Sequence, residues 1–423
     1  MTFLLFAAGA TVIAFGVTVL TTPLVRRVAL ARAWTDAPDG ERKLHAQVTP
    51  SAGGLAIFAG VVTATALAAY ALPMLGFGTL GLAAPVVIGA FVMVALGAID
   101  DTRGLGFKAK LAVEIAVAYA LLHAGLRIDL SVLPFVGDDV FLDALYSIPL
   151  TILWVVGIIN AVNLIDGIDG LASGVAAIAF ASMAIAHGLS GDLALVLIAV
   201  VFVGALAGFL VHNFNPASIF MGDSGSLFLG YALAVYTLSG PAHDQAFLAP
   251  VLPLLALGLP LLDTSLSMVR RVVGRQAIMA PDHDHIHHRM SGLMPTRKAV
   301  VRLYAVSGAF GLLAVLADTA SGTWVFVAIG CAAAVAAGLV IRLGYVRLPY
   351  SPPALRPVAG PPAAVAQPEA QPEAHPEATV EAHAVADGEA IGADPPPRPA
   401  SSFRLRRRTT DAAPRTPAGE HYL

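Results

Sequence analysis

Charged residues are scarce in this sequence. Only 13% of its 423 residues are charged and 57% are hydrophobic, whereas a soluble domain carries about 25% charged residues. The shortage excludes an ordinary water-soluble protein and indicates that lipid is the main solvent. Apolar runs of about 18 residues or more recur through the first 345 residues, and each is long enough to cross a bilayer as a helix. Helix is the expected form because lipid cannot satisfy free backbone groups.

The sequence also has only one cysteine and no basic residue near its N-terminus. The single cysteine, Cys331, lies inside an apolar run, which excludes an intramolecular disulfide. The first basic residues, Arg26 and Arg27, follow the first apolar stretch instead of preceding it. The N-terminus therefore does not resemble a cleavable signal peptide.

The predicted fold class is an all-α polytopic membrane protein with about eleven transmembrane helices. Segment 127–144 alternates apolar and acidic residues around Pro134 and Gly137, which predicts a short external hairpin or loop. The expected spans are 3–25, 53–74, 80–99, 109–126, 145–162, 170–188, 192–211, 224–239, 247–268, 302–318 and 323–343.

Lysine and arginine set the expected orientation. They gather in loops 26–50, 100–110 and 269–302, which lie on one side when the spans are counted, while the opposite loops are acidic. The N-terminus is therefore expected outside and the C-terminus in the cytoplasm, and the protein is expected in the plasma membrane.

The composition changes near residue 346, which divides a membrane domain, 1–345, from a tail, 346–423. Pro, Ala and Glu dominate the tail, and QPEAQPEAHPEA at 367–378 is a four-residue repeat. Such a segment has too little apolar variety to fold, so we expect a disordered cytoplasmic tail. The basic run 404–408 is interpreted as a solvated charge cluster, with anionic lipid contact as the alternative.

Four inside loops carry polar groups that a structural loop does not need. The first contains Asp100 and Asp101, adjacent carboxylates that repel one another unless a cation lies beside them. A divalent metal, a basic substrate clamp, or Lys108 and Lys110 would supply that charge. The alternatives are a solvated helix end for the acids and interfacial anchoring for Lys110.

The second loop repeats amides and carboxylates every third residue. An α-helix would turn successive members by about 60°, whereas a 3₁₀ turn would align them. Gly167 and Gly170 favour a broken helix that points these groups at a ligand. A polar helix end followed by turns is the alternative. The repeated residues are Asn160, Asn163, Asp166 and Asp169.

In the third loop, Asp223 lies between Gly222 and Ser224 just before an apolar run. Ser224 or Ser226 is a candidate cap for the next helix. A helix N-terminus with free amides would bind phosphate. Asp223 could share that place only through a metal, and magnesium suits carboxylates together with phosphates.

The fourth loop packs four histidines into six residues and ends in Arg289. Zinc is one interpretation, but no cysteine supports it. Diphosphate binding is favoured, because Arg289 offers a bidentate fork and histidines donate hydrogen bonds or protons. The histidines are His283, His285, His287 and His288.

These loops resemble the polyprenyl-phosphate N-acetylhexosamine-1-phosphate transferases. The similarity runs from about residue 1 to 345 and keeps the family's motif order. Its motifs are RKLHAQVTPSAGGLAIF at 42–58, AIDDTRGL at 98–105, NAVNLIDGIDGLASG at 160–174, NFNPASIFMGDSGSLFLG at 213–230 and HIHHR at 285–289.

The resemblance implies a Mg²⁺-dependent transfer of a sugar-1-phosphate from a UDP-sugar to undecaprenyl or a similar polyprenyl phosphate, with release of UMP. Mn²⁺ is a possible substitute. HIHHR favours the branch that uses UDP-N-acetylglucosamine and starts cell-wall or surface polysaccharide synthesis. The alternative is the phospho-N-acetylmuramoyl-pentapeptide transferase of peptidoglycan synthesis. The implied partners are both substrates and the bilayer, with a homodimer as an alternative to a single chain, but no nucleic acid.

The resemblance also implies roles for individual residues. Asp100, Asp101 and Asp223 are expected to be catalytic, with Asp100 as the base that deprotonates the lipid phosphate. Asp223 is the expected metal ligand, completed by Asn163 or Asp101. The substrate-binding candidates are Lys43, His45, Lys110, Asn160, Asn163, Asp166, Asp169, His285, His287, His288 and Arg289.

A membrane transporter is the alternative from a different class. It predicts charges near the bilayer midplane and often an internal repeat. The polar motifs instead gather at one boundary, and neither half of the chain resembles the other. A CDP-alcohol phosphotransferase or an intramembrane aspartyl protease would need further spaced aspartates that the sequence lacks.

Overall fold

The computed structural model describes residues 1–36, 49–128, 140–240, 251–275, 285–319 and 323–345. These residues are helical apart from short turns and one strand pair, in which β1 (Thr35–Asp36) and β2 (Thr49–Pro50) run antiparallel. The helices are α1 (Thr2–Ala31), α2 (Gly54–Met74), α3 (Ala84–Arg103), α4 (Phe107–His123), α5 (Val140–Ile165), α6 (Leu171–Ser190), α7 (Leu193–Asn213), α8 (Asp223–Leu238), α9 (Val251–Ala256), α10 (Gly258–Val273), α11 (Ile286–Leu293), α12 (Thr296–Thr319) and α13 (Thr323–Arg342).

The all-helical, polytopic prediction is confirmed. Each expected apolar span falls on a helix, although 247–268 falls on two, α9 and α10. Among the described residues, eight helices are long and apolar enough to cross a membrane. The helices α4, α8 and α10 have 17, 16 and 16 residues, just below the usual length of a span.

One boundary in the prediction is wrong. Segment 127–144 was expected to lie outside the helices, yet α5 already begins at Val140. An apolar run, Val140-Phe141-Leu142, continues the helix pattern in front of the expected start at 145. The rest of the expected hairpin, 129–139, lies outside the described residues, as does the tail from 346 onward.

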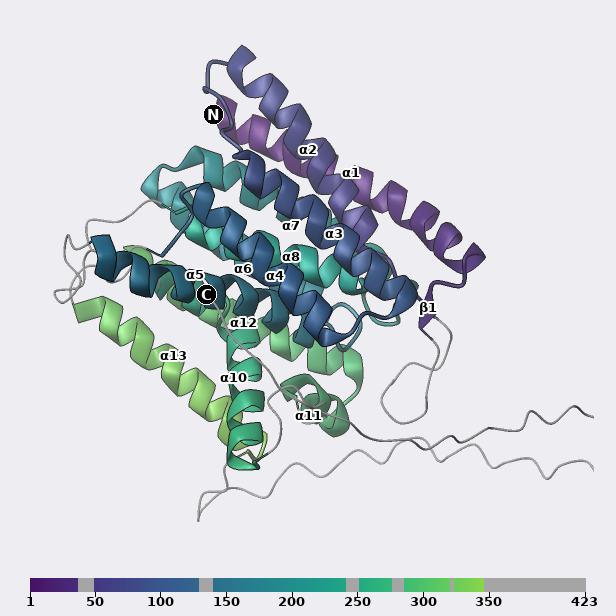
Figure 1. The fold of residues 1–423 in the computed structure, drawn as a ribbon, viewed down its shortest axis with the longest axis vertical. Helices are drawn as coiled ribbons and strands as arrows, with labels where there is room; N and C mark the ends of the chain where they lie inside the picture. Colours follow the sequence, from purple (N-terminus) through teal and green to yellow (C-terminus); the bar gives the residue numbers. More distant parts are fainter. Residues whose placement is uncertain (37–48, 129–139, 241–250, 276–284, 320–322, 346–423) are drawn as a thin grey trace, which may run out of the picture. The chain divides into compact units, whose positions relative to one another are not determined.

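Large apolar side chains are exposed along the outer helices, as expected for a lipid-facing surface. Leu4 and Leu20 on α1, Met74 on α2, and Trp324 and Phe326 on α13 each expose more than half of their surface. Inside, small residues let helices approach closely. A Cβ on Gly204 or Gly208 of α7 would overlap or crowd the backbone of α1, and Figure 1 shows these helices side by side.

Helix α8 is the centre of the bundle and packs against α3 and α5. Most of its residues are buried, as expected of a helix that is apolar on every side. Gly97 of α3 has no room for a Cβ against the backbone of Asp223, and Gly230 has none against Ile159 of α5. These close approaches bring the end of α3 to the beginning of α8.

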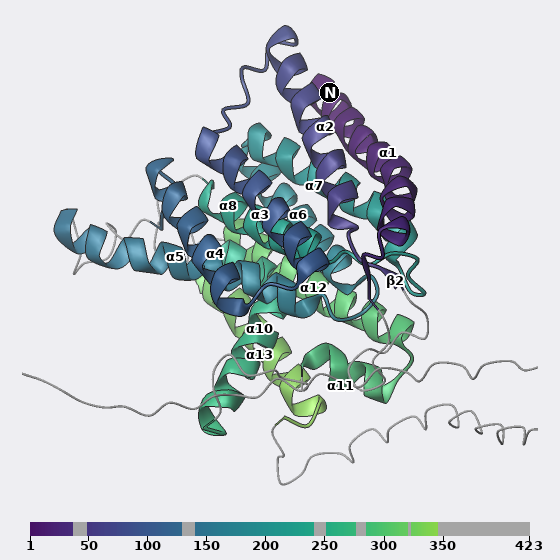
Figure 2. The same ribbon diagram turned by 45° about the vertical axis from the view of Figure 1, so that its right-hand side comes forward.

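The short helices α10 and α11 lie together beyond the ends of the long helices (Figure 2). The backbone N–H of Ile286, the first residue of α11, donates to Asp263 of α10 at 2.8 Å. This contact fixes where the histidine motif begins.

Candidate functional site

The first and third predicted motifs meet at one lysine. Lys110 Nζ lies 2.7 Å from Asp100 Oδ2 and 2.8 Å from Asp223 Oδ2. These residues come from α4, from the end of α3 and from the beginning of α8. Asp100 also accepts a hydrogen bond from the backbone of Leu105, which closes the turn between α3 and α4. The ammonium group thus holds together two carboxylates that would otherwise repel one another.

Asp101 contacts different partners from the adjacent Asp100. Its Oδ1 accepts from the Asp223 amide at 2.7 Å and its Oδ2 from the Ser224 amide at 3.1 Å. It therefore caps α8 from another helix, and the prediction that Ser224 or Ser226 caps α8 is wrong. The next two amides, of Gly225 and Ser226, donate to the Gly222 carbonyl. The start of α8 thus offers no free amide for phosphate, contrary to the sequence-based expectation.

Gly222 is needed for this capping. Its φ is +72°, in the region that favours glycine, and a Cβ there would lie 2.6 Å from Asp101 Oδ2. A side chain would therefore push the Asp101 carboxylate away from the amides. The lack of space for a side chain therefore explains why a glycine stands between Met221 and Asp223.

The two asparagines of the second motif contact different partners. Asn163 Nδ2 donates to Asp223 Oδ1 at 3.1 Å and to Ser226 Oγ at 2.8 Å. Asn160 Nδ2 donates to Glu114 Oε2 at 2.6 Å. Both asparagines lie in regular α-helix, so the 3₁₀ alternative is wrong. Asn163 joins the carboxylate cluster, whereas Asn160 joins a buried acid of α4.

The helix breaks after Ile165, as Gly167 and Gly170 predicted, and Gly170 has a φ of +78°. In this turn Asp169 is tied to the loop before α8: its Oδ2 accepts from Asn215 Nδ2 at 2.8 Å and from the Ala217 amide at 2.9 Å. Tyr304 Oη donates to the Gly170 carbonyl at 2.6 Å. These bonds hold the turn in place beside α12 and the loop that precedes α8.

The carboxylate of Asp166, in the same turn, has no hydrogen bond or salt bridge to any described residue. Burial, together with the charges of Asp223, Asp101 and Asp169, raises the pKa of Asp166 to about 8. The cluster therefore holds more negative charge than Lys110 can balance.

A divalent cation would fit this excess of charge. The available donors are carboxylate and amide oxygens, which suit Mg²⁺ better than zinc. Asp166 and Asp223 are the better candidates to hold the ion. The Asp166 carboxylate has no partner among the described residues, and Asp223 is bonded to the side chains of Asn163 and Lys110. Both oxygens of Asp101 are instead bonded to the backbone amides that begin α8. The described residues contain no group of three His, Cys, Asp or Glu that is already arranged around a metal, so the zinc alternative has no support within them.

The histidine motif lies beside the 166–170 turn. His287 is 2% exposed, and a Cβ on Gly167 would overlap its Nε2. Asp263 Oδ2 lies 3.2 Å from His285 Nδ1 and 3.7 Å from His287 Nδ1. The motif thus adjoins the carboxylate-bearing turn, as expected if all four motifs serve one site.

Arg289 has partners at the end of α13. It donates to the Leu343 carbonyl at 2.8 Å, and its guanidinium carbon lies 3.7 Å from the centroid of the Tyr345 ring. Part of its donor fork is therefore used within the protein. Among the other predicted site residues, Lys43, His45 and His283 lie outside the described residues, and Lys108 is exposed.

Two acids of the site escaped the sequence analysis. Glu114 and Asp263 are each 2% exposed and each contacts a motif residue. An isolated acid within an apolar run is the signal that could have identified them, because such groups are costly in a membrane and are usually functional.

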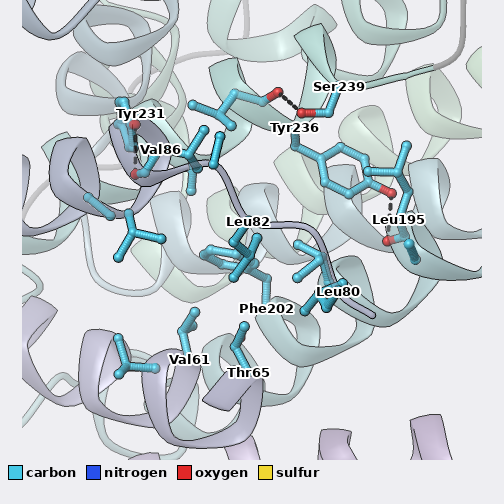
Figure 3. A pocket seen from close by; sticks show the side chains of 18 of the residues that line it. Val61, Thr65, Leu80, Leu82, Val86, Leu195, Phe202, Tyr231, Tyr236 and Ser239 are labelled. Carbon is cyan, nitrogen blue, oxygen red and sulfur yellow. Dashed lines mark hydrogen bonds between the residues drawn. The ribbon is translucent and has the colours of Figure 1, made fainter. Parts of the chain in front are cut away.

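An apolar cavity lies between α2, α3, α7 and α8, away from the motifs (Figure 3). Its volume is about 620 Å³. Tyr231 Oη donates to the Val86 carbonyl at 2.9 Å and Tyr236 Oη to the Leu195 carbonyl at 3.1 Å. Its tyrosine hydroxyls are thus satisfied within the protein, and the charged chemistry lies at the other ends of α3 and α8.

The fold and the site together define a polytopic membrane protein with an acidic, cation-suited cluster at the ends of its helices. The chain belongs to glycosyl transferase family 4, whose model matches residues 83–240. The family resemblance of the motifs is thereby confirmed. The matched segment carries three of the four motifs, and the histidine motif follows it.

The relatives agree with one another. The chain is 39% identical to a "Probable undecaprenyl-phosphate N-acetylglucosaminyl 1-phosphate transferase" of Bacillus subtilis, over 73% of this chain and 86% of that protein. It is 37% identical to a "Decaprenyl-phosphate N-acetylglucosaminephosphotransferase" of Mycolicibacterium smegmatis, over 70% and 78%. An "Undecaprenyl-phosphate alpha-N-acetylglucosaminyl 1-phosphate transferase" of Escherichia coli is 27% identical, over 69% and 79%.

Proposed function

We propose that this protein transfers N-acetylglucosamine-1-phosphate from UDP-N-acetylglucosamine to undecaprenyl phosphate or a similar polyprenyl phosphate and releases UMP. The relatives' activities support the reaction. The observation in the structure that carries it is Lys110, which joins Asp100 and Asp223 near Asp166, whose carboxylate has no partner among the described residues. The product would start a cell-wall or surface polysaccharide.

The reaction must bring two anions together, the lipid phosphate and the donor diphosphate, so their repulsion is the main obstacle. Lys110 supplies a fixed positive charge at the place where they meet. Asp100 is the proposed base that removes a proton from the lipid phosphate, so that a phosphate oxygen attacks the β-phosphorus of the donor. UMP leaves as the bond between the two donor phosphates breaks.

Magnesium is the proposed cofactor. Asp223 and Asp166 would hold the ion, with the Asn163 amide beside them, and Asp101 would act indirectly by fixing the start of α8. When bound, the ion neutralises diphosphate charge and stabilises the leaving phosphate. Asp223 accepts a hydrogen bond from Asn163 and forms an ion pair with Lys110. These two contacts fix the orientation of the carboxylate that would hold the ion.

The proposed membrane arrangement has eleven spans, with the site on the cytoplasmic face. Loops 26–50, 100–110 and 269–302 are rich in Lys and Arg and fall on the same side as the four motifs when the spans are counted, which the positive-inside rule assigns to the cytoplasm. The nucleotide sugar would then enter from water and the polyprenyl phosphate from the bilayer. Segment 346–423 remains a predicted disordered cytoplasmic tail.

The deciding assay supplies membranes that contain the protein with radiolabelled UDP-N-acetylglucosamine, undecaprenyl phosphate and Mg²⁺. We expect UMP and a lipid-linked N-acetylglucosamine diphosphate. Product only with UDP-N-acetylmuramoyl-pentapeptide would assign the protein to the peptidoglycan branch. Uptake of a solute without either product would favour a transporter.

A further inference from the structure

The cavity between α2, α3, α7 and α8 has its mouth on the apolar outer surface of the helix bundle. Val62 of α2, Leu82 in the loop before α3, and Val87 and Phe91 of α3 line the cavity, and each also exposes more than a third of its surface. These side chains continue the apolar surface of the outer helices, which faces lipid in a polytopic membrane protein. A molecule that enters between α2 and α3 therefore comes from the bilayer.

The lining of the cavity offers little to a polar ligand. Four of its five polar side chains are hydrogen-bonded within the protein, and the fifth is Thr65. An apolar cavity does not hold water, and leaving about 620 Å³ empty would destabilise the bundle, because the cost of a cavity grows with its volume. The occupant is therefore mainly hydrocarbon. The four bonded side chains are Asp192, Tyr231, Tyr236 and Ser239.

The cavity has the length of one leaflet of a bilayer. On α8 its lining runs from Phe228 to Ser239, a rise of about 16 Å at 1.5 Å per residue. The hydrocarbon core of a bilayer is about 30 Å thick, so the cavity extends through about half of it. Because the lining begins beyond the first turn of α8 and continues to the end of the helix, this is the half away from Asp223.

Three phenylalanine rings close the cavity on the side of the carboxylate cluster. Phe58 of α2 lies edge to face with Phe91 of α3 and with Phe228 of α8, at centroid distances of 4.9 and 5.1 Å. Phe58 and Phe228 lie in the second turn of their helices, whose first residues meet where a Cβ on Gly54 would overlap the backbone of Gly225. This aromatic layer separates the cavity from the cluster inside the bundle. A polyprenyl chain whose phosphate is bound at the cluster therefore has no direct path into the cavity.

We propose that this cavity binds a bilayer phospholipid of the leaflet opposite the carboxylate cluster, with one acyl chain lying along α8. An acyl chain has the apolar surface that the lining requires, and it runs along the membrane normal over the depth of one leaflet, as the cavity does. The bound chain fills the space between α2 and α3 and stabilises the bundle by its packing contacts. It takes no part in the transfer chemistry, so the inference is independent of the proposed function.

The test uses a phosphatidylglycerol with a photoreactive diazirine near the middle of one acyl chain, added to the purified full-length protein in detergent. Mass spectrometry of peptides locates the crosslinks. Labelling of Tyr231 or Val235 is expected, because both line the cavity and are only 1% and 8% exposed, so lipid around the bundle does not reach them. Labelling confined to the outer faces of the helices would overturn the proposal.

A matched pair of variants makes the same change at two places on α2. Thr65 lines the cavity (Figure 3), whereas Thr63 is exposed and lies outside it. Thr65→Phe should remove most of the labelling on α8, because the ring occupies the place of the chain, and Thr63→Phe should leave it unchanged. Wild-type labelling of α8 in Thr65→Phe would contradict the assignment of the cavity.

Competition identifies the source of the chain. Unlabelled phosphatidylglycerol should displace the label from α8, and undecaprenyl phosphate at the same concentration should not; the reverse order would assign the cavity to a polyprenyl chain and overturn the proposal. If Thr65→Phe does not fold, Ala232→Phe fills the cavity from α8 and must lose the same labelling. Added phospholipid should also raise Tm of the wild type and of Thr63→Phe more than that of either cavity-filling variant. An equal rise in all of them would refute a lipid site in the cavity.

Discussion

Helices α3 and α8 have opposite chemistry at their two ends. At one end lie Asp100, Asp101 and Asp223, where one lysine balances only part of the negative charge. At the other end they line an apolar cavity whose tyrosine hydroxyls are satisfied by backbone carbonyls. Size alone would direct attention to the cavity. Incomplete charge compensation is the better guide to reactivity here, because it shows where the protein needs a charged ligand.

The largest expected effect is at the acidic end. Asp223→Asn removes the proposed metal ligand and one partner of Lys110, so the transfer rate should fall about 10³-fold. The measurement is the rate of lipid-linked sugar formation in membranes. The control is Asp192→Asn at the cavity end, where Asp192 caps α7 through the Leu195 amide and asparagine caps equally well. Normal transfer by Asp223→Asn would refute its assignment.

Lys110→Met should lower kcat about 10²-fold, since it removes the fixed charge that offsets phosphate repulsion. Lys108→Met is the matched control, because Lys108 is exposed on the same helix. Steady-state kinetics with both substrates measures the change. If Lys110→Met and Lys108→Met lowered kcat equally, the rate would depend on the overall positive charge of this region and not on the position of Lys110.

Asp100→Asn should lower the rate less at high pH than at low pH if Asp100 removes the proton from the lipid phosphate. At high pH that phosphate has already lost its second proton, so a base is needed less. A pH–rate profile of kcat tests this. A wild-type rate at every pH would refute the role of Asp100 as base.

Asp166 links stability to pH. Its pKa is raised to about 8 in the folded protein, against about 3.9 when unfolded. The unfolded state therefore binds fewer protons between these values, and stability without Mg²⁺ should fall as pH rises from about 4 to 8. Asp166→Asn should flatten this pH dependence. At pH 8 it should also raise Tm, by about 2 to 4 °C for each kcal/mol by which the substitution increases the free energy of unfolding.

Thermal unfolding of the detergent-solubilised protein, followed by intrinsic fluorescence, provides the measurement. Mg²⁺ should stabilise the wild type at pH 8 more than it stabilises Asp166→Asn. Identical pH dependence in the two proteins would show that Asp166 does not carry the excess charge.

The smallest effect is expected at the cavity end. Tyr236→Phe removes a hydrogen bond to the Leu195 carbonyl and should cost about 1 kcal/mol of stability without changing the transfer rate. Thermal unfolding and the lipid-product assay measure the two quantities. A large loss of transfer would contradict the separation between the two ends.

The sequence predicted the helices and the residue types of the site well, because apolar runs and local motifs report these directly. The sequence could not predict which partner each of these residues contacts. Asp100 and Asp101 are neighbours in sequence, yet one pairs with Lys110 and the other caps α8. That difference depends on the close packing of α3 against α8 at Gly97, which is a tertiary contact. Glu114 and Asp263 were missed because each is a single acid in an apolar run, outside any motif.

The central claim is that the cluster around Lys110 transfers a sugar phosphate between two phosphorylated substrates. The most direct measurement quantifies UMP and lipid-linked N-acetylglucosamine together, with purified protein, Mg²⁺, UDP-N-acetylglucosamine and undecaprenyl phosphate. Equal amounts of the two products are expected from the wild type, and Asp223→Asn should lose both in parallel. UMP release without the lipid product, or unchanged products from Asp223→Asn, would contradict the account.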